Sequence, residues 1–133
     1  MDRLTILDRA TDAGADARQP GQRCCQADGH GALDTGQAEG LTADLDVLAN
    51  PIRLRLLSLL TASDVPVCVC DLEAAVPVKQ PTVSHHLKLL RAAGLVESEK
   101  RGLWAYYHVR QDELDRLRRR IAAGLGRLGG HHE

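Results

Sequence analysis

Aromatic side chains are nearly absent from this sequence of 133 residues, which contains no Phe, one Trp and two Tyr. The cores of β-sandwiches depend on aromatic and β-branched residues, so a fold of that class is disfavoured. The apolar residues are mainly Leu, Val, Ile and Ala, which favours a core of packed helices. The length fits one domain, and a charged fraction of 26% is that of an ordinary soluble protein.

Long apolar runs are absent as well. No segment approaches the roughly 20 residues needed to cross a bilayer, and none near Met1 resembles a signal peptide. We therefore expect a cytoplasmic protein with no membrane partner. In a reducing compartment, paired cysteines such as Cys24-Cys25 and Cys68-Val69-Cys70 bind metal or undergo redox chemistry more often than they form structural disulfides.

The net charge of −1 hides a difference between the two ends of the chain. Residues 1–49 contain four basic and nine acidic residues, whereas residues 50–133 contain thirteen basic and nine acidic ones. The stretch from Val78 to Arg110 is especially basic. This charge is compatible with nucleic-acid binding, although a solvated surface would also account for it.

Apolar spacing and turn residues predict a mainly α-helical domain with a β-hairpin wing, which is a winged helix-turn-helix. Asn50-Pro51 is a helix start, because Asn is a favoured N-cap and Pro fits the first turn. Asp71 is expected to cap a short helix that Pro77 stops. In chain order we expect a flexible arm over 1–37, the winged domain over 38–125 and a flexible tail over 126–133. Its helices are expected over 37–48, 51–60, 72–76, 80–93 and 112–125, and its strands over 95–100 and 104–109, with the turn at Arg101-Gly102.

The helix expected over 80–93 has short hydrogen-bonding side chains in its first two turns. A helix that enters the major groove presents its N-terminal residues to base edges, and its amide dipoles favour nearby phosphate. Gln80 suits bidentate recognition of adenine, and Lys100 and Arg101 on the wing suit the DNA backbone or minor groove. The candidate DNA-binding residues are Lys79, Gln80, Thr82, Ser84, His85, His86, Lys88, Lys100 and Arg101. The alternative is a solvated helix face with one of the two histidines turned inward.

Cys68 and Cys70 have a spacing whose use depends on the backbone. In an ideal helix, residues i and i+2 point ~200° apart, so two thiolates there could not share an ion. In an extended segment they point to the same side. A soft or borderline ion such as trivalent arsenic, cadmium, lead or zinc therefore requires a non-helical start of the following helix. Two buried core thiols are the alternative.

Three blocks stand out in combination: Leu48-Ala49-Asn50-Pro51-Ile52-Arg53-Leu54, Cys68-Val69-Cys70-Asp71-Leu72, and the run from Gln80 to Val96. Together they resemble the ArsR/SmtB family of bacterial metal- and metalloid-sensing repressors, over roughly residues 38–118. The resemblance implies a homodimer, joined through its first and last helices, that binds a palindromic operator in double-stranded DNA. It also implies release of that DNA when an inducer binds.

One departure from the family bears on the inducer. Arsenic repressors with a local site carry a third cysteine one turn after the second, and here that position is Glu73. Arsenite prefers three thiolates, which leaves Cys24 and Cys25 on the arm to complete the site. We expect arsenite or antimonite as the inducer, bound by Cys68, Cys70 and the arm cysteines, with no organic cofactor. The four thiolates would also suit cadmium or lead.

Other functions remain as alternatives. The zinc-sensing branch of the family uses an Asp-x-His, which Asp115-Arg116-Leu117 lacks, while His131 and His132 follow two glycines in the predicted tail. A repressor released by thiol oxidation is a further alternative. An enzyme with a reactive cysteine is disfavoured, because the sequence has no Cys-x-x-Cys at a helix start and no Cys/His catalytic context.

Overall fold

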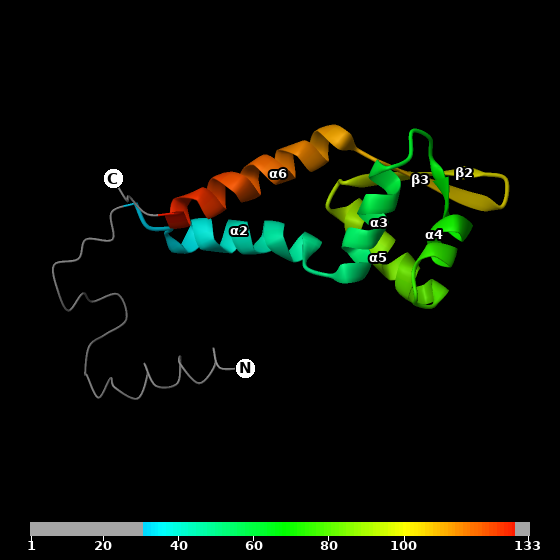
Figure 1. The fold of residues 1–133 in the computed structure, drawn as a ribbon, viewed down its shortest axis with the longest axis horizontal. Helices are drawn as coiled ribbons and strands as arrows, with labels where there is room; N and C mark the ends of the chain where they lie inside the picture. Colours follow the sequence, from blue (N-terminus) through cyan, green and yellow to red (C-terminus); the bar gives the residue numbers. More distant parts are fainter. Residues whose placement is uncertain (1–30, 130–133) are drawn as a thin grey trace, which may run out of the picture. The chain divides into compact units, whose positions relative to one another are not determined.

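A computed structural model of the protein describes residues 31–129 (Figure 1). Cys24, Cys25, His131 and His132 lie outside these residues, as does most of the predicted arm. In chain order the elements are α2 (Thr35–Leu48), α3 (Pro51–Thr61), β1 (Val67–Cys68), α4 (Val69–Ala75), α5 (Gln80–Ala92), β2 (Val96–Arg101), β3 (Trp104–Val109), α6 (Gln111–Gly126) and the 3-10 turn η1 (Arg127–Gly129). The predicted fold class, helices with a β-hairpin wing, is confirmed.

Helix α2 begins at Thr35, before the predicted start at Gln37 and inside the segment expected to be a flexible arm. Asp34 caps it, because its carboxylate accepts the Gln37 N–H at 2.7 Å. The Gln37 side chain accepts the Asp34 N–H in return, at 3.0 Å. This reciprocal pair satisfies two backbone donors that the helix leaves without a partner, and so extends α2 toward the N-terminus.

Helix α3 begins where the sequence predicts. The Asn50 side-chain oxygen accepts the backbone N–H groups of Ile52 at 2.8 Å and Arg53 at 3.2 Å. Pro51 is the first helical residue, a position where its missing N–H costs nothing. The cap fixes the orientation of the first turn of α3, which includes Arg53.

Helix α4 differs from the prediction of a helix over 72–76 capped by Asp71. It begins at Val69, and its N-cap is Cys68, whose backbone is extended with φ −63° and ψ 140°. Asp71 lies inside the first turn, where a carboxylate interacts favourably with the positive end of the helix without capping it. The last helix, α6, extends from Gln111 to Gly126, and η1 continues helical structure to residue 129. The sequence predicted that this helix ends at residue 125.

The sheet has three antiparallel strands in the order β1-β3-β2. Arg101 pairs with Trp104, so the turn is Gly102-Leu103, one residue later than expected. Gly102 has φ +65°, which glycine adopts without strain at the first position of such a two-residue turn. Strand β1 adds Val67 opposite Tyr107 and Cys68 opposite Tyr106. The wing is therefore joined to the start of α4.

The core lies where α3, α4 and α5 pack against one another and against the sheet. Its buried side chains are Leu56, Leu57, Leu60, Leu72, Val76, Val83, Leu87, Leu90, Leu95, Val96 and Leu117. No aromatic residue belongs to this fully buried set, as the composition predicts. Within residues 31–129 no helix is long and apolar enough to cross a membrane.

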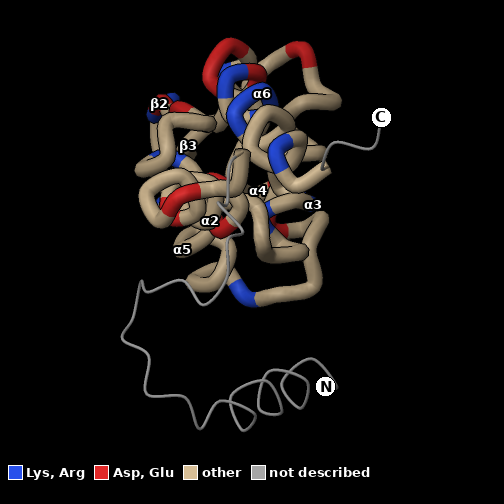
Figure 2. Tube along the Cα trace, turned by 90° about the vertical axis from the view of Figure 1, so that its left-hand side faces the viewer, with Lys and Arg blue, Asp and Glu red and all other residues tan. Residues whose placement is uncertain are grey.

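Helices α2 and α6 lie side by side and extend away from this core (Figure 1). Arg120 of α6 forms a two-pronged ion pair with Asp44 of α2, at 3.1 and 3.2 Å. Gly124 allows the helices to approach closely, because a Cβ there would lie 2.8 Å from Leu41 Cδ1. Acidic residues begin α6 and arginines follow in its middle (Figure 2).

Candidate DNA interface and thiol site

The exposed face of α5 carries most of the predicted DNA-binding residues. Ser84, His85 and Lys88 are exposed and, with Pro81, Arg91 and Tyr107, line a cavity of about 370 Å³ on the surface of the helix. Lys79, Gln80 and Thr82 are exposed at its N-terminal end, where no side chain caps the backbone N–H groups. Free N–H groups, hydroxyls and cations together suit phosphate and base edges.

Arg91 and Tyr107 belong to this surface although the sequence analysis did not include them. Arg91 was identifiable, because Ser84, Lys88 and Arg91 follow the i, i+4, i+7 spacing of one helix face. Tyr107 was not, since its place depends on how β3 packs beside α5. The cavity therefore combines a helix face with one residue of the wing.

His86 is the one predicted DNA-binding residue that the structure turns inward. Its side chain is buried, and Nδ1 lies 3.2 Å from Nη1 of Arg53, which is also buried. Burial, the Arg53 charge and the neighbouring His85 all lower the pKa of His86. The expectation that His86 contacts DNA is therefore corrected. The signal was present, because Val83, His86, Leu87 and Leu90 occupy the spacing of a buried helical stripe.

The wing presents Lys100 and Arg101 to solvent. The Arg101 guanidinium is partly held in place: Nη2 lies 2.6 Å from Glu99 Oε1, and Cζ lies 4.7 Å from the centre of the Tyr106 ring. At the tip, Leu103 is 93% exposed. The wing thus carries a fixed cation near Tyr106 and an apolar tip.

Cys68 and Cys70 meet the geometric condition derived from their spacing. Cys68 ends β1 in extended conformation, and Cys70 lies in the first turn of α4. Their sulfur atoms are 2.7 Å apart, with Cys68 buried and Cys70 exposed. The hydrogen bond to Cys68 and burial raise the pKa of the Cys70 thiol. Two sulfurs on one side of the chain have the arrangement that chelation requires.

A third ligand is not found among the residues that the structure describes. Within 31–129 no three His, Cys, Asp or Glu side chains are grouped so as to hold an ion. Glu73, at the position where arsenic repressors have a cysteine, has one buried carboxylate oxygen with no hydrogen-bond partner. Two thiols alone would leave a trigonal soft ion one ligand short.

The thiol pair is connected to both DNA-facing elements. Cys68 pairs with Tyr106 of β3, the strand whose next residue lines the cavity beside α5. Cys68 also occupies the N-cap position of α4, without a capping hydrogen bond from its side chain, and α4 packs against α5. Cys68 is therefore linked to the wing through β3 and to α5 through α4.

Known proteins resemble the chain in both sequence and fold. A sequence profile described as "Bacterial regulatory protein, arsR family" matches residues 50–98. The "Transcriptional repressor SmtB homolog" of Synechocystis is 38% identical over 93 residues, covering 70% of this chain and 69% of its own. The "Putative arsenical resistance operon repressor ArsR2" of Halobacterium salinarum is 39% identical over 105 residues, covering 77% and 82%.

Among solved structures, one described as a "Possible transcriptional regulator for arsenical resistance" superposes with a TM-score of 0.56 at 36% identity, covering 60% of this chain and 81% of its own. The transcriptional repressor BigR of Xylella fastidiosa superposes with a TM-score of 0.52 at 26% identity, covering 63% and 85%. The residues that match the sequence profile of the family include Asn50, Cys68, Cys70 and the whole of α5. The chain therefore belongs to the ArsR family of bacterial regulatory proteins, which are DNA-binding transcriptional regulators and not enzymes.

Proposed function

We propose that the protein is a homodimeric, metalloid-responsive repressor that holds a palindromic operator through α5 and the wing. Arsenite or antimonite releases it by binding the thiols of Cys68 and Cys70 together with Cys24 or Cys25. The observation that carries the proposal is the convergence of two sulfur atoms, 2.7 Å apart, at the start of the helix that supports α5.

The binding step is a ligand exchange. Each thiol that binds replaces one hydroxyl group of arsenite, which leaves as water with the thiol proton, and arsenic stays trivalent. The arm cysteines are adjacent in sequence, so they supply one or two thiolates to a trigonal ion more readily than a full chelate to a tetrahedral one. Binding of the ion shifts the backbone at Cys68, which disturbs the pairing of Cys68 with Tyr106 and the N-terminal end of α4.

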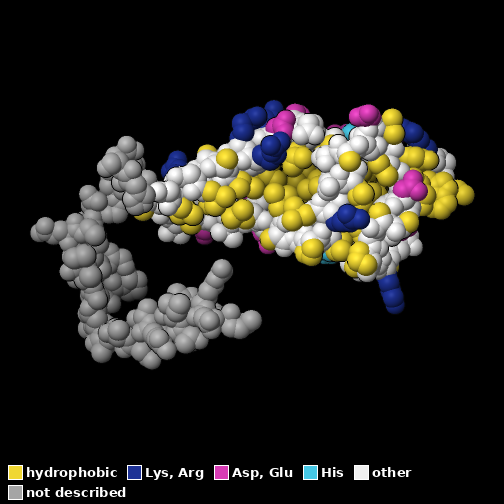
Figure 3. Space-filling view, in the orientation of Figure 1, with side chains coloured by type: hydrophobic (Ala, Val, Ile, Leu, Met, Phe, Trp, Pro, Cys, Tyr) yellow, Lys and Arg dark blue, Asp and Glu magenta, His cyan; other side chains and the backbone are white. Residues whose placement is uncertain are grey.

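The proposal of a dimer is supported by apolar side chains on α2 and α6 that remain exposed in a single chain. This helix of 14 residues buries no side chain fully within one chain, and α6 buries only Leu117. Apolar side chains gather over the two helices (Figure 3). Leu45 of α2, Leu125 of α6 and Leu128 of η1 are 38%, 45% and 66% exposed. Helices gain most of their stability from packing an apolar face, so a second copy is the expected cover.

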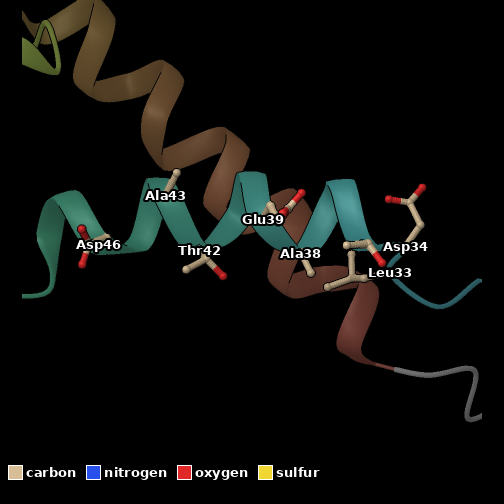
Figure 4. Close-up of a pocket in the computed structure, with 8 residues that line it drawn as sticks. Leu33, Asp34, Ala38, Glu39, Thr42, Ala43 and Asp46 are labelled. Atoms are coloured by element: carbon tan, nitrogen blue, oxygen red, sulfur yellow. The ribbon is translucent and has the colours of Figure 1, made fainter. Parts of the chain in front are cut away.

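The surface of α2 is hollowed along the helix. The hollow has a volume of about 570 Å³ and is lined partly by the small side chains of Ala38, Thr42 and Ala43 (Figure 4). Leu33 lies at its N-terminal end, and Asp34, Thr35, Glu39 and Asp46 complete the lining. Small side chains let another backbone approach closely, and this supports α2 as part of the dimer surface.

The test is fluorescence anisotropy of labelled promoter DNA with the full chain, titrated with arsenite and, in parallel, with cadmium. Arsenite should raise the operator Kd at least about tenfold, within the ordinary range of allosteric coupling. Replacing Cys24 and Cys25 together by Ser should remove this response. A Kd that arsenite does not change would contradict the proposal.

Cadmium, lead or zinc is the alternative inducer, and all four thiolates together would suit it. A divalent ion displaces the protons of the thiols it binds, whereas arsenite takes them up as water. Isothermal titration in two buffers of different ionisation enthalpy separates the two. Release by peroxide without metal, reversed by a reductant, would instead indicate a redox sensor.

A further inference from the structure

Arg53 is a charged side chain placed in the interior, 9% exposed. Its guanidinium makes three hydrogen bonds. Nε donates to the carbonyl of Val47 at 2.7 Å, and Nη2 donates to the carbonyl of Asp46 at 2.8 Å. Nη1 donates to His86 Nδ1 at 3.2 Å. One side chain of α3 thus bonds α2 on one side and α5 on the other.

The contacts with α2 satisfy a specific need of that helix. Asp46 and Val47 lie in its last turn, where carbonyl groups lack the i+4 N–H partner of the helix interior, and the Asp46 carbonyl accepts the backbone N–H of Ala49 at 3.3 Å. A cation at this end also offsets the negative pole of the helix dipole. The structure gives α2 no basic residue in its own last turn. Arg53, oriented by the Asn50 cap, supplies the charge from the next helix.

The contact with α5 fixes the state of His86. A guanidinium only donates, so Nδ1 of His86 accepts and the ring is neutral, with its proton on Nε2. His86 is two residues from both Ser84 and Lys88, which places it on the opposite side of α5 from these exposed residues. The hydrogen bond between Arg53 and His86 therefore holds the buried face of α5, opposite the exposed face proposed to contact DNA.

Both partners occupy positions that the sequence pattern assigns to the core. Arg53, Leu56, Leu57 and Leu60 form the buried stripe of α3, and Val83, His86, Leu87 and Leu90 form that of α5. Each stripe follows an i, i+3, i+4, i+7 pattern with one polar residue, Arg53 at position i of its stripe and His86 at position i+3 of the other. Leucine contacts between the stripes are non-directional, whereas the planar guanidinium imposes direction.

We propose that the Arg53–His86 pair sets the orientation of recognition helix α5 relative to α2, and thereby the half-site spacing that the dimer accepts. This inference rests on the proposed homodimer and its operator. In a dimer joined through α2 and α6, the distance and angle between the two α5 helices follow from how each α5 is held to its own α2. Arg53 is the side chain whose directed bonds link the two helices.

The experiment measures operator affinity against half-site spacing. The operator is first located by footprinting the wild-type protein, and its centre is then lengthened and shortened by one base pair. Each step rotates one half-site by about 35° and moves it by about 3.4 Å. Arg53→Lys keeps the charge and loses the planar fork, and His86→Leu removes the acceptor. Arg55→Lys, at an exposed arginine of the same helix, is the matched control.

Wild type and Arg55→Lys should prefer the native spacing. Arg53→Lys and His86→Leu should reduce that preference roughly fivefold, the effect of losing about one hydrogen bond. His86→Gln keeps an acceptor and should retain the preference, and thermal melting confirms that each variant folds. If His86→Leu does not fold, Arg53→Lys and His86→Gln still decide the question.

Equal weakening at all spacings would reduce the pair to an ordinary structural contact and overturn the inference. An unchanged preference in Arg53→Lys would overturn it as well. Both results leave the proposed function intact, because wild type still binds its operator. Failure of wild type to bind any promoter DNA, or to dimerise, would instead contradict the proposed function itself.

Discussion

Replacing each cysteine of the thiol pair by Ser should abolish induction equally and affect stability unequally. The chelate needs both sulfurs, so arsenite should no longer raise the operator Kd of either variant. Cys68 is 8% exposed, and within residues 31–129 the one hydrogen-bond partner of its Sγ is Cys70. A hydroxyl buried there lacks a good partner, which costs about 2 kcal/mol, or roughly 10 °C in Tm for a domain of this size. Cys70 is exposed, so its replacement should change stability by less than about 0.5 kcal/mol.

The assay pairs operator anisotropy, with and without arsenite, with thermal unfolding followed by circular dichroism. Cys70→Ser is the matched control for Cys68→Ser, because the chemical change is the same and only the burial differs. Retained induction in either variant would refute the assignment of the pair to the inducer site. Equal loss of Tm in both would refute the argument from burial.

Three further predictions concern other parts of the molecule. Ser84→Ala or His85→Ala should weaken operator binding without changing arsenite binding. Arg91→Ala should lower the magnitude of the slope of log Kobs against log salt by about 1. An unchanged operator Kd and an unchanged salt slope would show that α5 is not the DNA interface. The pKa of His86 is lowered by burial and then by the charges of Arg53 and His85. At mildly acidic pH the unfolded chain therefore binds a proton at this imidazole that the folded chain does not bind. The free energy of unfolding should therefore fall as the pH drops below about 6.5, and His86→Gln should lose part of this dependence while His85→Gln retains it. Leu125→Asp should shift the protein from dimer to monomer in sedimentation, with Leu103→Asp, at an exposed leucine of the wing, remaining dimeric.

Much of the fold was predictable because its signals are local. Asn50-Pro51 starts a helix through its own side chain, and the apolar spacing of α5 and Gly94 after it define the recognition helix. The start of α4 was not predictable in the same way. Asp71 has the sequence signal of a cap, but the pairing of Cys68 with Tyr106 on a distant strand sets where the extended backbone ends.

The candidate site divides similarly. The cysteine spacing predicted a pair that chelates only if the first residue is extended, and this holds in the structure. An inward-facing histidine was an open alternative in the sequence analysis, but which of the two adjacent histidines turns inward was not assigned. What separates them is that His86 shares the buried stripe of Val83 and that a cation from α3 meets it there. Contacts between elements, such as the place of Tyr107 beside α5, depend on the packed fold.

Trp104, the only tryptophan of the chain, is the first residue of β3 and is 53% exposed. It stands on the wing, on the same strand as Tyr106, which pairs with Cys68. Ultraviolet emission from this indole therefore arises from the wing alone, with no background from the core or the dimer helices. The protein carries an intrinsic optical probe on the strand that pairs with Cys68, and motion of that strand can be timed by stopped flow without a label.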